Sequence, residues 1–96
     1  MTWIPIIPPQ QAQGELQKAY QEVYALYPPE YGVEVDTIKR ADGTADSIVA
    51  AHSLIPQALL HSMSAFGAMM SPDLPLSRAQ HEMIATVVSA LNACFY

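Results

Sequence analysis

Apolar residues recur along the chain at the spacing of a helix face in several places, separated by stretches rich in proline and glycine. The first pattern predicts a helix over 11–27, because its apolar positions follow i, i+3, i+4, i+7, i+8 and i+11. These positions are Leu16, Ala19, Tyr20, Val23, Tyr24 and Tyr27. Pro28 and Pro29 end the helix, since proline cannot continue it.

The middle of the chain, residues 30–44, is polar and interrupted by glycine. Val33–Asp36 alternates like a strand but has no convincing partner, so this stretch is interpreted as a loop with a turn at Asp42-Gly43. A short helix is expected over 45–53. Pro56 suits the first turn of a further helix over 56–70. The apolar side of that helix consists of Leu59, Leu60, Met63, Phe66, Gly67 and Met70.

The last helix has the clearest beginning. After a tight linker over 71–75, Ser77 followed by Gln80 forms a capping-box pattern. An apolar stripe runs from Ile84 to Leu91, and Asn92 closes the helix because asparagine can adopt the left-handed conformation. The chain is therefore expected to be all-α, with about four helices in a single domain over residues 1–96. A proline-rich arm over residues 1–10 lies either across its own core or across a neighbouring subunit.

Composition adds the expectation of a homo-oligomer. Apolar residues make up 51% of the chain and charged residues 14%, against about 25% charged in an average soluble domain. A monomer would expose a large apolar surface, and such surfaces usually mark interfaces.

Charge and segment length exclude other classes. The net charge of −5 argues against nucleic acid as a partner. No apolar run reaches the roughly 20 residues of a membrane span. The first basic residue is Lys18, so the N-terminus does not resemble a secretory signal. A single cysteine fits a reducing compartment, and a cytoplasmic location is expected.

Few side chains could carry chemistry. His52, His61 and His81 do not have metal-ligand spacing, so they are interpreted as surface or partly buried helix residues, and no metal site is expected. The helical methionines are interpreted as core residues; they are Met63, Met69, Met70 and Met83.

Cys94 allows two interpretations. If a new helix begins at Ala93 or Cys94, the sulfur lies at a helix N-terminus, where partial positive charge favours the reactive thiolate. Alternatively, Cys94 is a small buried residue that continues the stripe of Ile84, Val88 and Leu91, and periodicity taken by itself favours this second interpretation.

The segment from Leu76 to Cys94 closely resembles the core of alkylhydroperoxidase D-like proteins, in the peroxidase-related branch of the carboxymuconolactone decarboxylase superfamily. The family motif is a Glu, eleven residues, a Cys, two residues, a second Cys, three residues and a His. Glu82 and Cys94 have the first of these spacings. The N-terminal arm, the helix around Gly14–Tyr20 and the segment His52–Pro56 also resemble that branch, so the resemblance covers nearly the whole chain.

The resemblance implies an antioxidant oxidoreductase that reduces peroxides or disulfides with a thiol or dithiol reductant and without metal, flavin or haem. Cys94 would be the resolving cysteine, and Glu82 would relay protons. The second redox position would be 97 and the histidine 101. The chain is therefore expected to be a truncated domain that is inactive by itself, and selenocysteine at position 97, read as a stop, is one explanation. A natural stop or a chosen domain boundary are others.

Two further functions remain open. The chain is alternatively a non-enzymatic helical oligomerisation module in which Cys94 belongs to the core. It could also belong to the decarboxylase branch of the superfamily, although that branch does not depend on the redox pair.

Overall fold

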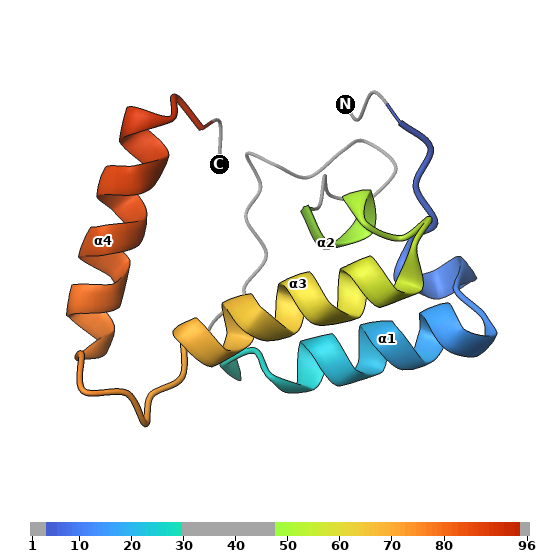
Figure 1. Ribbon diagram of the computed structural model, residues 1–96, viewed down its shortest axis with the longest axis horizontal. Coiled ribbons are helices and arrows are strands. Elements are labelled where there is room, and N and C mark those ends of the chain that lie inside the picture. The colour runs from blue at the N-terminus through green and yellow to red at the C-terminus, as the bar shows by residue number, and fades with distance from the viewer. Residues whose placement is uncertain (1–3, 30–47, 95–96) are drawn as a thin grey trace.

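The computed structural model describes residues 4–29 and 48–94, and these residues form an all-helical structure (Figure 1). The expected loop over 30–44, with its turn and its strand-like Val33–Asp36, lies outside the described residues. A 3₁₀ helix, η1 (Pro9–Gln11), precedes four α-helices in the described part. These are α1 (Gly14–Ala25), α2 (Ile48–Ala51), α3 (Pro56–Met69) and α4 (Arg78–Leu91).

Helix α1 is shorter at both ends than the predicted helix over 11–27. Its first residue, Gly14, has a φ of +58°, a conformation that glycine adopts without strain, so the chain turns sharply between η1 and α1. At the other end the amide of Tyr27 donates to the carbonyl of Tyr24 at 3.2 Å, which tightens the last turn before Pro28. The predicted interior of the helix is confirmed.

Helices α1 and α3 run side by side in the same direction and form the core, with α2 packed on α3 (Figure 1). Val23 of α1 and Leu59 of α3 are 0% exposed. Their predicted apolar faces supply most of the buried cluster, which consists of Ala12, Leu16, Ala19, Tyr20, Val23, Val49, Leu59 and Met63. Burying a side chain such as Leu59 contributes about 1.5–3 kcal/mol, so this cluster is the main source of stability.

The end of α1 approaches α3 closely at Gly67. A Cβ at this position would lie 2.9 Å from Cβ of Leu26, which follows directly after α1. Because Cβ of Leu26 is fixed to the backbone, a larger residue at position 67 would force the helices apart. Gly67 therefore lies on the core face, as the sequence predicts, because a residue without a side chain fits against Leu26.

The N-terminal arm, described from Ile4 onward, packs on its own core. The amide of Ile7 donates to Oγ of Ser53 at 2.8 Å, and its carbonyl accepts from the hydroxyl of Tyr20 at 2.6 Å. Tyr20 and Ser53 are 3% and 1% exposed. The arm was expected to lie across either its own core or a neighbouring subunit, and its described part packs on its own core.

Helix α4 stands apart from this body, joined to α3 by a turn at residues 70–77 (Figure 1). Within this turn, the carbonyl of Ser71 accepts from the amide of Leu74 at 3.3 Å. Contacts between α4 and the other described helices are sparse compared with those between α1 and α3. His81 is the one buried residue of α4.

Candidate functional site

The beginning of α4 is the predicted capping box. Oγ of Ser77 accepts from the amide of Gln80 at 3.3 Å, and Oε1 of Gln80 accepts from the amide of Ser77 at 2.8 Å. Two amides at the start of the helix are thereby satisfied. The helix therefore begins where the sequence predicts, with Glu82 in its first turns and Cys94 beyond its end.

The end of α4 differs from the prediction in one respect. Asn92 follows the helix, but its φ is −84°, and the left-handed residue is Ala93 with a φ of +50°. The amide of Cys94 donates to the carbonyl of Ser89 at 2.9 Å, and that of Ala93 donates to the carbonyl of Ala90 at 3.1 Å. This pair of bonds is a Schellman motif, which requires its positive φ one residue after Asn92.

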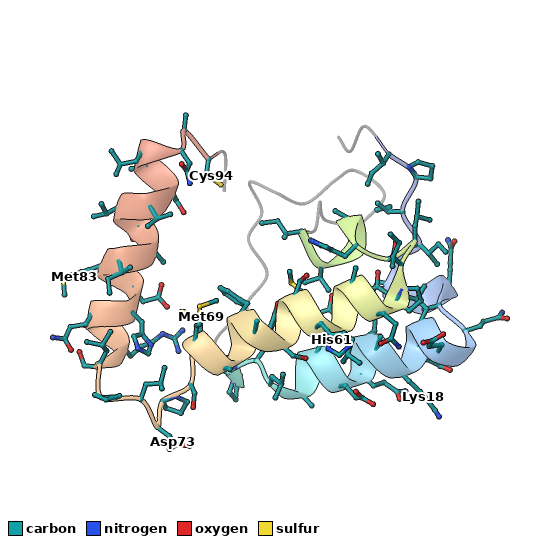
Figure 2. All side chains as sticks on the ribbon, in the orientation of Figure 1. Lys18, His61, Met69, Asp73, Met83 and Cys94 are labelled. Carbon is teal, nitrogen blue, oxygen red and sulfur yellow. The ribbon has the colours of Figure 1, made fainter. Side chains whose placement is uncertain are left out.

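Cys94 is exposed, so the interpretation that it continues a buried stripe is wrong. The Schellman motif ends the helical periodicity at Leu91 and turns the chain, which places the thiol beyond the stripe. Figure 2 places its sulfur at the end of α4, on the side that faces the body. A helix beginning at Ala93 or Cys94 would need the residues after Cys94, which lie outside the described part.

Glu82 lies on the first turns of α4, where Oε1 accepts from Nε of Arg78 at 2.7 Å. Both side chains are partly exposed, so the ion pair is worth about 0.3–0.5 kcal/mol. Leu91 lies nine residues after Glu82 on the helix, so the two are separated by about 14 Å along the helix axis. The structure therefore does not bring the carboxylate of Glu82 to the thiol of Cys94.

The histidines differ from one another. Nδ1 of His52 lies 2.7 Å from the carbonyl of Ile48, and Nε2 of His61 lies 3.1 Å from Oε1 of Gln57. These two fit the interpretation as helix-surface residues. The described residues contain no cluster of three or more histidine, cysteine, aspartate or glutamate side chains that could hold a metal.

His81 is different, because it is 6% exposed and its Nε2 is buried without a hydrogen-bond partner among the described residues. Sequence reasoning missed this residue as a candidate. The available signal is its spacing, since His81 precedes Ile84 by three residues and Val88 by seven, and so lies on the inner apolar side of α4.

The methionines also divide into two groups. Met63 is buried in the core, as predicted, and the hydroxyl of Tyr27 lies 3.7 Å from its sulfur. Met69 and Met83 are exposed, so the prediction that they are core residues is wrong. Met83 is exposed because no helix packs against its face of α4 in the described structure.

Comparison of the chain with protein-family models, curated proteins and solved structures found no match. Within the described residues, no helix has the length and apolar character required to cross a membrane.

Proposed function

We propose that the chain carries the resolving half of a peroxide-reducing thiol oxidoreductase, in which Cys94 is the resolving cysteine and Glu82 a proton-relay carboxylate. The observation that supports this best is the position of Cys94, which is exposed directly after the turn that closes α4. Eleven residues separate it from Glu82, as in the alkylhydroperoxidase D-like pattern. An exposed thiol is accessible both to a neighbouring redox group and to a reductant.

The reaction would begin at a second thiol or selenol three positions after Cys94. Its anion attacks one peroxide oxygen, the O–O bond breaks, and the other oxygen leaves as an alcohol or water after taking up a proton. The thiolate of Cys94 attacks the resulting sulfenic or selenenic acid: a disulfide or selenosulfide bond forms, the S–O or Se–O bond breaks, and the hydroxyl group takes up a proton and leaves as water. A dithiol reductant then supplies two electrons and restores both groups, which suits a reducing compartment such as the cytoplasm.

The codon after Tyr96 is the first test. We expect a cysteine codon, or UGA followed by an open reading frame. A different sense codon at this position would contradict the proposal, and so would a true stop.

The second test measures peroxide-dependent oxidation of a dithiol by the full reading frame, with cysteine at position 97. Cys94→Ser should leave a stoichiometric burst in place of steady turnover, because the oxidised partner can no longer be resolved. Glu82→Gln should lower kcat by about hundredfold if the carboxylate relays protons. Gln80→Glu, which keeps a capping side chain on the same helix, is the matched control. Comparable turnover by the 96-residue chain itself would contradict the assignment of the site.

A second candidate, a helical association module, is favoured by the outer face of α4. Met83 points away from the body (Figure 2), and Leu91 on the same side of the helix is 82% exposed. Together with Val87 these residues form an apolar strip that is exposed to solvent in a monomer. We propose that copies of the chain associate through this strip.

Sedimentation velocity tests the association. The chain should sediment as a dimer or larger species, and Val87→Lys should shift it toward the monomer. Thr86→Lys adds the same charge on a different side of α4 and should leave the assembly intact. A compact monomer at all concentrations would contradict the second candidate without bearing on the redox proposal.

A further inference from the structure

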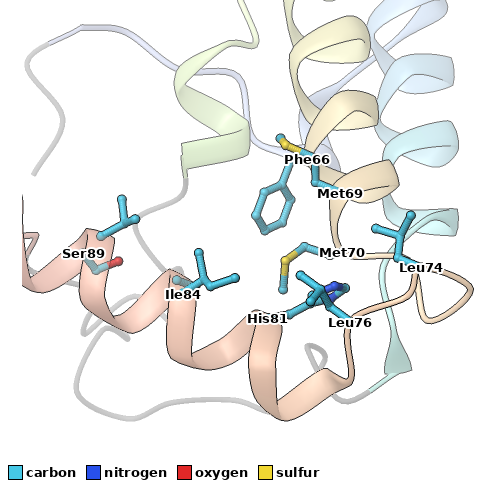
Figure 3. Close-up of a pocket in the computed structure, with 10 residues that line it drawn as sticks. Phe66, Met69, Met70, Leu74, Leu76, His81, Ile84 and Ser89 are labelled. Carbon is cyan, nitrogen blue, oxygen red and sulfur yellow. The ribbon is translucent and has the colours of Figure 1, made fainter.

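A cavity of about 450 Å³ lies between the end of α3, the turn that follows it and the inner side of α4 (Figure 3). Its size is within the range of small-molecule sites in proteins, about 300–1,000 Å³. Its walls are almost entirely apolar, and the residues that matter for the argument are Phe66, Met69, Met70, Leu76, His81 and Ala85. The cavity is broadly open to solvent, so a molecule can enter it.

The unusual member of this lining is His81. The side chain is buried, yet Nε2 has no hydrogen-bond partner among the described residues. A buried polar atom without a partner costs about 1–3 kcal/mol, and such atoms are uncommon in native proteins. A partner supplied by an occupant of the cavity would remove this cost.

The chemistry of the walls restricts the occupant. A charged group would lose its hydration among apolar side chains, and an anion would also meet a chain of net charge −5. A hydroxyl both donates and accepts, so it can pair with Nε2 in either tautomer of a neutral imidazole. The remainder of the occupant must be apolar to match the walls.

We propose that this cavity binds a small neutral molecule that is apolar except for one hydroxyl, which pairs with Nε2 of His81. Met69 and Met70 line the cavity and have unbranched side chains that change rotamer readily, so the walls can adjust around an occupant. The site is independent of Cys94, so it stands whether or not the redox proposal holds. It is also distinct from the outer strip of α4, which lies on another side of the helix.

The test titrates the chain with 4-propylphenol and, as a matched probe without the hydroxyl, propylbenzene. Methyl-labelled methionine reports the binding place by NMR. Signals of Met69 and Met70 should shift with 4-propylphenol, while that of Met63, in the α1/α3 core, should not. Tighter binding of the phenol than of propylbenzene is expected.

Two variants separate the hydroxyl contact from the cavity. His81→Phe keeps an aromatic ring but removes the nitrogen. The variant should therefore bind 4-propylphenol about tenfold more weakly than the parent chain does, and its affinity for propylbenzene should be unchanged. Ala85→Leu fills the cavity and should weaken the binding of both probes. Because α4 is not part of the α1/α3 core, both variants should keep the melting temperature of the parent chain.

Three results would overturn the proposal. The first is the absence of any shift at Met69 and Met70 up to the solubility of the phenol. The second is that His81→Phe binds 4-propylphenol with the same affinity as the parent chain. The third is a change in the same methionine signals on dilution without ligand, which would mean that a second copy of the chain occupies the cavity.

Discussion

Helix α1 of the α1/α3 body and the separate helix α4 have similarly clear amphipathic patterns, yet only α1 buries its apolar face. Val23 and Leu59 are completely buried between α1 and α3, whereas Ile84, Val87, Val88 and Leu91 of α4 are all exposed. The difference is not in the helices, since α4 has the better N-terminal cap. An apolar stripe specifies that a helix needs a partner, but not where the partner comes from.

The same comparison explains where the candidate chemistry lies. The body contains core residues and the hydrogen bonds that hold the arm, while α4 and the turn before it contain Glu82, Cys94 and the cavity around His81. Binding and catalytic groups commonly occupy such less tightly packed regions. The cavity lies where α4 faces the end of α3 and the turn between them.

Removing a core side chain from the body is the change with the largest expected effect. Leu59→Ala should lower the free energy of unfolding by about 2–5 kcal/mol, because it leaves a cavity in the packed interior. Val88→Ala removes an apolar side chain of α4 that is already exposed and should cost less than about 0.5 kcal/mol. Urea denaturation followed by circular dichroism measures both. A Val88→Ala cost as large as that of Leu59→Ala would show that the inner side of α4 is packed in solution.

The hydrogen bonds of the arm give the second prediction. Tyr20→Phe removes the hydroxyl that donates to the carbonyl of Ile7 and should cost about 1–2 kcal/mol. The loss should appear as faster proteolysis of the arm as well as a lower denaturation midpoint.

Tyr20 also makes the body sensitive to alkaline pH. Burial raises the pKa of Tyr20 above its ordinary value of 10.0, with Tyr24 adding to the rise and the hydrogen bond with Ser53 opposing it. A raised pKa in the folded state means that stability is complete below about pH 10 and is lost as the pH rises through the folded pKa. The parent chain should therefore lose more stability than Tyr20→Phe above pH 10. Parallel curves for the two proteins would contradict this account.

The sequence predicts the helices well because periodicity and capping are local. Pro56 begins α3 and Ser77 caps α4, as their positions in the pattern indicate. The short α2 lies within the expected helix over 45–53 but ends at Ala51, two residues before the predicted end.

Other features depend on contacts that no local pattern specifies. The Ile7–Ser53 hydrogen bond joins residues 46 positions apart. The burial of His81 depends on how the turn after α3 orients α4. The left-handed residue was expected at Asn92 from residue preference, but the Schellman hydrogen bonds place it at Ala93.

The smallest effect concerns the end of α4 and leaves the body untouched. An alanine in the left-handed conformation costs about 1 kcal/mol, which glycine does not incur. Ala93→Gly should therefore stabilise the last turn of α4 by up to this amount and slow hydrogen exchange of the Cys94 amide by as much as about fivefold. Ala90→Gly, inside the helix, should speed the same exchange by a similar factor, because glycine weakens a helix interior.

The melting temperature of the body should stay unchanged in both glycine variants, since α4 has few contacts with α1 and α3. Faster exchange in Ala93→Gly would mean that Ala93 is not left-handed in solution and that the helix continues past Asn92. In that case Cys94 would return to the apolar stripe, and the separation between a packed body and an open α4 with an accessible thiol would no longer hold. The Ala93→Gly variant thus tests the turn on which the assignment of Cys94 depends.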